Sequence, residues 1–246
     1  MTLVKAPCVL ASLILYSFFA YGQPAGVDTL ARSNAIYLTK QAYQSALAGN
    51  SQVFNGIDYI DPLQKKKLNG TPYFLNDEWQ EGFVFYGDQL FENVSLRYNL
   101  FLNKLLIEHV QSHATIEMIL EKIKYFGISN HTFVWLSNST TQSDVKEGFY
   151  EVLYSGKTKV YARRYKTIKE VADQKVMVTE FLDKRKLYLF KDEQYFAITN
   201  KGSALNAFGE DKSEIKKFLS QEKLNFRSDP ESALVAIANY YDDLKK

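Results

Sequence analysis

Hydrophobic and polar residues alternate with a period of two over much of the chain between residues 80 and 200. In the clearest stretch, residues 93–100, four apolar residues alternate with polar ones: Val94, Leu96, Tyr98 and Leu100. This alternation predicts a β-strand with one buried and one solvated side. Residues 83–86 before it, followed by the turn-forming Gly87 and Asp88, predict the first arm of a hairpin.

Further short strands are predicted at the regular spacing of an antiparallel sheet. They lie at residues 104–110, 115–120, 131–136, 148–154, 158–165, 175–182, 186–190 and 194–199. The last two predict a hairpin whose tip, residues 191–194, is charged. Long helices do not alternate with these strands, so neither a parallel doubly wound sheet nor the nucleotide-binding folds built on one are expected.

Helical periodicity is confined to the two ends of the chain. Residues 29–48 predict a helix, and Ile215, Phe218 and Leu219 predict a short one near the end. A last helix should begin at Asp229 and Pro230. The fold class expected is α+β and mainly antiparallel β: a strongly curved sheet or partial barrel of short strands, with an N-terminal helix and two C-terminal helices packed on it.

The first residues predict a secretory leader. A positive start at residues 1–5 precedes an apolar run at 6–20, and small residues at 20 and 22 suit signal peptidase. As a helix the run would rise about 22 Å, less than the roughly 30 Å hydrocarbon core. We therefore expect a cleaved signal peptide at 1–22, a single exported β-rich domain at 23–246 without a transmembrane segment, and a periplasmic or extracellular location.

Composition excludes several function classes. Lys and Arg number 30 against 28 Asp and Glu, so net charge does not favour a nucleic-acid partner. The only cysteine, Cys8, lies in the predicted leader. A mature chain without cysteine has no disulfide, thiolate nucleophile or Cys-ligated metal, and its stability must come from a packed core.

Several motifs resemble those of a known group. They are Asn55-Gly56-Ile57-Asp58-Tyr59, Trp79-Gln80-Glu81-Gly82-Phe83-Val84-Phe85-Tyr86-Gly87, Asn93-Val94-Ser95-Leu96-Arg97-Tyr98-Asn99-Leu100, and a closing segment ending in Asn239-Tyr240-Tyr241. Together they resemble a group of exported, uncharacterised proteins of Bacteroidetes-type bacteria. The resemblance implies export and a compact mature chain, and it carries no catalytic residues to transfer.

Signatures of catalysis and of cofactor binding are missing from the sequence. The histidines are His109, His113 and His131; the first two, on a strand that ends in a turn, are expected more than about 12 Å apart, and the third is expected to start a strand. Nucleophile elbows and phosphate-binding loops are absent. We therefore predict no catalytic, cofactor-binding or metal-ligating residues and no cofactor.

Carboxylates between residues 58 and 78 leave one enzymatic alternative open. A glycosidase needs two acids roughly 5–9.5 Å apart, and Asp58 or Asp61 with Asp77 or Glu78 would meet that need if the fold brought them together. The stretch is rich in Gly, Pro and aromatic residues, as sugar-binding loops are. The alternative interpretation is turn chemistry, in which these side chains accept hydrogen bonds from backbone amides.

A basic tract and many aromatic residues complete the pattern. The tract consists of Lys157, Lys159, Arg163, Arg164, Lys166 and Lys169, and it is interpreted as a solvated strand face, with an anionic membrane surface or glycolipid headgroup as the alternative. The chain has 17 Tyr, 17 Phe and 2 Trp. These suit a core and cross-strand pairs, and a curved sheet lined by them could also enclose a lipid.

Taken together, these features favour a non-enzymatic cell-envelope protein that binds an apolar ligand or a protein partner, with a lipid or an envelope protein as the expected partner. An envelope polysaccharide hydrolase that uses the carboxylate pair is the alternative. A purely structural surface protein would have a filled core and no closed pocket.

Overall fold

The computed structural model describes residues 52–137, 145–173 and 176–246, all within one compact unit that spans 48–246. The predicted signal peptide and the predicted helix at 29–48 lie outside the described residues. No helix in the described part of the chain is both long and apolar enough to cross a membrane.

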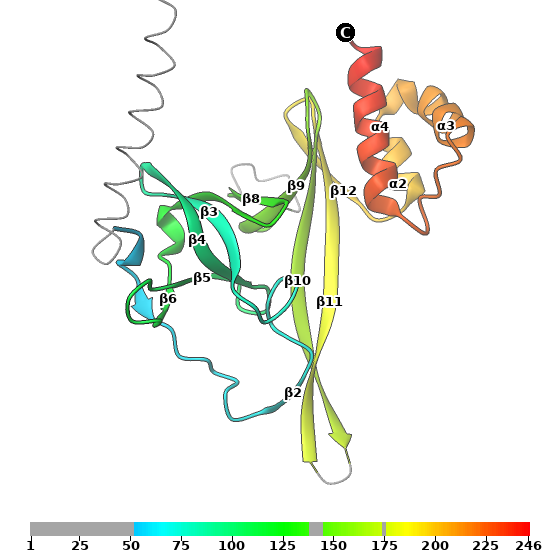
Figure 1. Cartoon of the computed structure of the whole chain (residues 1–246). Helices are drawn as coiled ribbons and strands as arrows, with labels where there is room; N and C mark the ends of the chain where they lie inside the picture. Colours follow the sequence, from blue (N-terminus) through cyan, green and yellow to red (C-terminus); the bar gives the residue numbers. More distant parts are fainter. Residues whose placement is uncertain (1–51, 138–144, 174–175) are drawn as a thin grey trace, which may run out of the picture. The chain divides into compact units, whose positions relative to one another are not determined.

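One sheet of twelve strands forms the body of the described residues (Figure 1). The strands are β1 (Ile57–Asp58), β2 (Lys67–Asn69), β3 (Gln80–Tyr86), β4 (Gln89–Asn99), β5 (Lys104–Glu108), β6 (Thr115–Glu117), β7 (Ile123–Ile128), β8 (His131–Leu136), β9 (Gly148–Ser155), β10 (Lys159–Asp173), β11 (Val176–Lys191) and β12 (Gln194–Ile198). Their order is β1-β6-β5-β4-β3-β7-β8-β9-β10-β11-β12. All these pairs are antiparallel, whereas β2 joins β11 in parallel.

The predicted, mainly antiparallel α+β class is confirmed, but the predicted strong curvature or partial barrel is wrong. The sheet is open, with β1 and β12 at its two ends, and it does not curl strongly into a partial barrel. Alternation along a sequence reports which side of a strand is buried, whereas closure depends on pairing between distant strands. The local pattern therefore could not distinguish an open sheet from a barrel.

A long hairpin of β10 and β11 runs beyond the neighbouring strands (Figure 1). The two strands predicted at 175–182 and 186–190 are one continuous strand, because residues 183–186 are exposed and charged yet remain paired with β10. At the other end of β11, Asp192 and Glu193 both have positive φ and connect it to β12. That two-residue turn confirms the hairpin with a charged tip.

The strand predicted at 115–120 is shorter than expected and ends at residue 117. A turn of 3-10 helix, η2 (Leu120–Lys122), separates it from β7, which the sequence pattern did not predict. β7 pairs with β3 and β8, and its burial shows no simple alternation: Lys124 is exposed, Tyr125 is half-buried, and residues 126–128 are all buried.

One row of paired residues runs across the sheet and shows how the core is arranged. Since paired residues point to the same face, Val84, Phe126, Phe133, Glu151, Ala162, Leu187 and Ile198 share one face. The first three belong to an aromatic core over β3–β8, and the last three belong to a second core under the helices. Glu151, the one charged member of the row, lies between the two cores.

The aromatic core is filled by large rings packed against one another. Tyr98, Phe126, Phe133 and Phe149 are all essentially buried. The rings of Phe126 and Phe133 stack at 4.9 Å, and Phe149 meets Phe126 edge-on at 4.9 Å. Offset-stacked and edge-on pairs of this kind add to the stabilisation from burial alone. The prediction that aromatic residues serve the core and cross-strand pairs is confirmed for these four.

Three helices cover the same face of the sheet near β9–β12 (Figure 1). They are α2 (Lys201–Asn206), α3 (Lys212–Gln221) and α4 (Pro230–Leu244), with short 3-10 turns at η1 (Gln52–Phe54) and η3 (Gly209–Asp211). The two predicted C-terminal helices are confirmed. The Asp229 side chain accepts a hydrogen bond from the Ser232 N–H and caps α4, as predicted. The short α2 was not predicted.

Candidate functional site

A network of charged side chains, centred on the buried Glu151, lies between the two cores. The Glu151 side chain is only 4% exposed and accepts a hydrogen bond from Arg164 Nε. Its other oxygen is in hydrogen-bond contact with Nδ1 of His131. A carboxylate buried among apolar side chains is stable only when it is paired in this way.

The charge network continues from Arg164 to helix α4. The other two guanidinium nitrogens of Arg164 donate to the two oxygens of Glu231, at 3.2 and 2.9 Å. Arg185, the residue opposite Arg164 on β11, also donates to Glu231, at 2.8 Å. Burial pushes the pKa of Glu231 up, but the hydrogen bonds and positive charges of Arg164 and Arg185 outweigh burial and lower the pKa below 4.5. Glu231 thus ties the first turn of α4 to the sheet.

Beside this network lies an open cleft of about 450 Å³, which we call the basic cleft. Its lining residues come from β10, β11 and two loops: Phe74, Leu75, Leu100, Arg164, Lys166, Asp183, Lys184 and Arg185. The Lys166 side chain is only 8% exposed, and its ammonium lies 3.3 Å from Asp183. The Asp183 side chain is 82% exposed, so a solvated carboxylate is the ion-pair partner of a buried cation.

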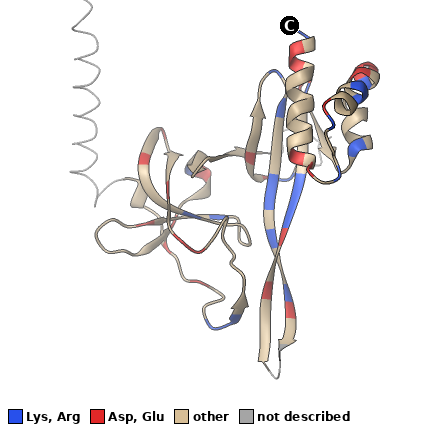
Figure 2. Cartoon of the chain, turned by 45° about the vertical axis from the view of Figure 1, so that its right-hand side comes forward, with Lys and Arg blue, Asp and Glu red and all other residues tan. Residues whose placement is uncertain are grey.

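In the described part of the chain, the outer edge of β11 is unpaired next to the basic cleft. On the outer side of β11, β2 pairs with residues 178–180 and β12 pairs with residues 187–191. Among the described residues no strand pairs with 181–186 on that side. Figure 2 shows Lys and Arg gathered in a band across the middle of this hairpin. An exposed edge with free amide and carbonyl groups is a template for another strand.

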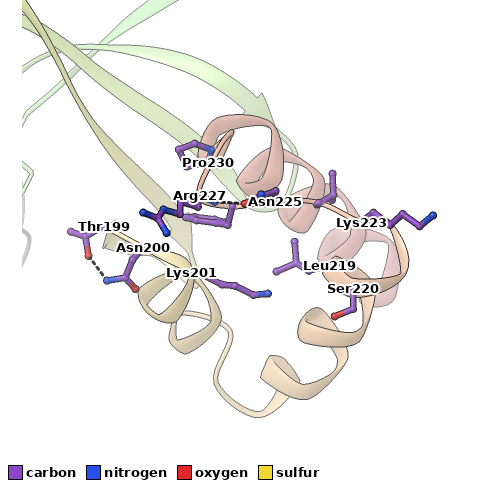
Figure 3. Close-up of a pocket in the computed structure, with 11 residues that line it drawn as sticks. Thr199, Asn200, Lys201, Leu219, Ser220, Lys223, Asn225, Arg227 and Pro230 are labelled. Carbon is purple, nitrogen blue, oxygen red and sulfur yellow. Dashed lines mark hydrogen bonds between the residues drawn. The ribbon is translucent and has the colours of Figure 1, made fainter.

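A second cleft, of about 710 Å³, lies between the start of α2, the end of α3 and the loop before α4 (Figure 3). The Lys201 side chain extends across it and the Ser220 hydroxyl is turned toward that side chain, whereas Lys223 points away. Asn200 and Asn225 accept hydrogen bonds from backbone amides of their own turns. These two asparagine side chains therefore serve the local turns that border this cleft.

Two of the four candidate carboxylates accept hydrogen bonds from residues within their own loops. Asp61 accepts a hydrogen bond from the Leu63 N–H at 2.8 Å, and Asp77 accepts one from the Thr71 hydroxyl. Asp58 and Glu78 are exposed. The turn interpretation is confirmed for Asp61, and it is the one of the four that lines a cleft, together with Arg97 and two tyrosines.

The histidines are engaged by neighbouring side chains and backbone. Residues 109–113 form a turn in which the His113 N–H donates to the His109 carbonyl at 2.9 Å, so the predicted extended separation of those two residues is wrong. His113 contacts Glu108, and His131 begins β8 as predicted. Among the described residues no three metal-ligating side chains come together.

The interpretation of the basic tract as a solvated face is wrong for two of its members. The Arg164 side chain is 21% exposed and that of Lys166 is 8% exposed. Both are ion-paired with acids of other elements, Arg164 with Glu151 and Glu231, and Lys166 with Asp183. Sequence analysis also missed Glu151 itself. The signal was present, since Glu151 is a single acid within the apolar run at 149–153, and such a residue calls for a buried partner.

Neither a family model, nor a curated protein, nor a solved structure gives a significant match to the chain. The resemblance to exported proteins of Bacteroidetes-type bacteria therefore stays a prediction.

Proposed function

We propose that this protein is a non-enzymatic binding protein of the cell envelope that holds a protein partner through an acidic, extended segment lying in the basic cleft. The observation that carries the proposal is the placement of Lys166, a buried cation at the wall of an open cleft. The envelope location rests on the leader predicted at residues 1–22.

Burial of a lysine is costly unless a close partner compensates for the water it loses. Asp183 compensates weakly, because it is itself solvated and 3.3 Å away. A carboxylate entering the cleft from a partner would be shielded from solvent by Phe74, Leu75 and Leu100, which line the same space. Its attraction to Lys166 would be stronger there than at an exposed site.

The open edge of β11 favours an extended segment over a compact anion. A strand laid along residues 181–186 would gain backbone hydrogen bonds, as in β-augmentation. Lys184, Arg185 and Lys186 supply the positive charge that an acidic strand would complement. The basic cleft and the open edge of β11 together therefore favour a partner segment that is both negatively charged and extended.

The alternatives from sequence have less support. An apolar ligand would need an enclosed dry space, whereas the sheet is open, its aromatic core is filled and the clefts described above open to solvent. A polysaccharide hydrolase would need converging acids, and Asp61 and Asp77 are engaged in their own loops.

The test is binding of a fluorescein-labelled peptide of alternating Glu and Thr, followed by anisotropy. We expect saturable binding by the full chain that weakens as salt rises, because charge pairs are screened. A peptide of alternating Lys and Thr should not bind. Lys166→Met, which keeps the side-chain length and removes the charge, should weaken binding at least about tenfold.

Lys217→Met is the matched control, since Lys217 is exposed on α3 and away from the hairpin. It should bind the acidic peptide as the parent chain does. Equal loss in both variants would show general charge attraction rather than a site. Retention of full affinity in Lys166→Met would remove the basis of the proposal.

A further inference from the structure

Arg97 lies near the end of β4, away from the charge network around Glu151. Its neighbours Leu96 and Tyr98 point into the aromatic core, so Arg97 points to the opposite face of the sheet. There its guanidinium carbon lies 4.2 Å from the Trp79 ring centroid and 5.5 Å from that of Tyr73. Flanking rings of this kind hold a guanidinium in a defined orientation.

The guanidinium of Arg97 lacks a polar partner among the described residues. Its Nε is buried and makes no hydrogen bond, which is true of no other buried side-chain nitrogen or oxygen in that part of the chain. None of the ion pairs in the described residues includes it. An arginine presents five N–H donors in a planar fork, and a buried donor left unpaired costs free energy. The arrangement is thus incomplete until a planar acceptor arrives.

Arg97 lines an open cleft of about 430 Å³ whose other walls are mostly polar. They are Tyr59, Ile60, Asp61, Gln64, Tyr73 and Thr115. The Tyr59 and Tyr73 hydroxyls are near neighbours, and Asn99 donates a hydrogen bond to the Tyr59 oxygen at 3.2 Å. Burial, with Tyr73 and Asp61 nearby, raises the pKa of Tyr59 above 10.0. Tyr59 therefore stays protonated at neutral pH.

The side chains that line this cleft match a ligand that carries both a carboxylate and several hydroxyl groups. A carboxylate is planar and accepts two parallel hydrogen bonds from a guanidinium fork. Two tyrosine hydroxyls, an amide, a threonine hydroxyl and the free oxygen of Asp61 are donors and acceptors suited to sugar hydroxyls. We propose that the Arg97 cleft binds a carboxylated sugar, such as a uronic acid unit of an acidic polysaccharide, with its carboxylate on Arg97.

The rest of the site favours a sugar acid over a free carboxylate or a phosphate. A small carboxylate would leave most of the polar wall opposite Arg97 without a partner. A phosphate carries more negative charge, which Asp61 would repel, whereas Asp61 can accept a hydrogen bond from a sugar hydroxyl. The cleft is thus suited to one negative charge joined to several hydroxyls.

The test is isothermal titration of the full chain with trigalacturonic acid, with neutral galactotriose and with glutarate. We expect binding of trigalacturonic acid at least about tenfold tighter than binding of the other two. Equal binding of galactotriose would overturn the role of Arg97. Equal binding of glutarate would show that any carboxylate suffices and would overturn the assignment to sugars.

Variants localise the binding. Arg97→Met should abolish it, and Arg97→Lys, which keeps the charge but loses the fork, should weaken it about tenfold. Arg227→Met is the matched control, because Arg227 is exposed in the loop before α4 and should leave affinity unchanged. If Arg97→Met does not fold, the Lys variant and Tyr59→Phe decide: unchanged affinity in both would overturn the proposal.

A direct readout comes from Trp79, whose ring lies against Arg97. The chain has 2 Trp, so Trp135→Phe leaves Trp79 as the single indole. Its emission should change with the same dissociation constant as the calorimetric titration. Binding detected by heat without any change in Trp79 emission would place the ligand elsewhere and contradict the assignment.

Discussion

Replacement of Glu151 by leucine tests the charge network that joins the two cores. In the cross-sheet row, leucine would continue an otherwise apolar sequence of paired residues and would fit by hydrophobicity alone. It would also leave His131 without its carboxylate and Arg164 with Glu231 as its remaining acid. We therefore expect Glu151→Leu to destabilise the fold despite its apolar surroundings.

The magnitude follows from the burial of the partners. Removal of one member of a buried ion pair costs about 3–5 kcal/mol, and the low end applies because Arg164 keeps Glu231. The extra apolar burial of leucine offsets about 1 kcal/mol of that loss. The net expectation is a decrease of about 2 kcal/mol in the free energy of unfolding, which lowers Tm by roughly 4–8 °C in a chain of this size.

The assay is urea unfolding followed by tryptophan fluorescence, with a double-mutant cycle of Glu151→Leu and Arg164→Met. The two residues are in direct contact, so the cycle should return a coupling of about 1–3 kcal/mol. Glu92→Leu, the same change at an exposed position of β4, is the control and should shift stability by less than about 0.5 kcal/mol.

Two results would refute this reasoning. One is a Glu151→Leu variant as stable as the Glu92→Leu control, which would mean that the buried network contributes nothing. The other is strict additivity in the cycle, which would mean that Glu151 and Arg164 act independently.

Three further predictions concern α4 and the basic cleft. Asp242 is buried, and its two carboxylate oxygens accept hydrogen bonds from the Thr158 N–H at 3.0 and 3.1 Å. Asp242→Ala should therefore lower the free energy of unfolding by about 1–3 kcal/mol in the same urea assay. The control Asp243→Ala, at an exposed position, should lower it by less than about 1 kcal/mol. Because the pKa of Glu231 is lowered in the folded state, its contribution to stability is full above pH 4.5 and is lost as the pH falls through the folded-state pKa. Glu231→Gln should therefore reduce the loss of stability at acidic pH. An unchanged dependence of stability on pH would contradict this. Lys166→Met should leave the free energy of unfolding unchanged or higher, because a buried cation with a solvated partner is replaced by an apolar side chain; a loss above about 2 kcal/mol would assign Lys166 a structural role instead.

Local patterns predicted the elements whose causes are local. Asp229 and Pro230 mark the start of α4 because a cap and a fixed φ act within one turn. The charged two-residue tip at 192–193 likewise determines the β11–β12 hairpin. Residues 93–99 of the alternating stretch lie on β4 with Leu96 and Tyr98 buried, as the pattern predicted, but Asn99, predicted on the solvated side, is buried as well.

Features that depend on distant residues could not be predicted in the same way. Nothing near Lys166 in the sequence indicates that it is buried, because Phe74 and Leu100 come from other parts of the chain. Glu231 is 67 residues from Arg164, so their ion pair could not be predicted from the sequence of the basic tract alone. The sequence therefore predicted only part of the candidate site: it identified the basic residues, but not the acidic residues that pair with them.

The most direct test of the proposed function is amide hydrogen exchange of the full chain with and without the alternating Glu and Thr peptide. If an acidic strand adds to β11, exchange should slow at residues 181–186 and leave the α2–α3 cleft unchanged. Peptide binding with no slowing at 181–186, or with slowing confined to the helices, would contradict the claim that this edge and the basic cleft hold the partner.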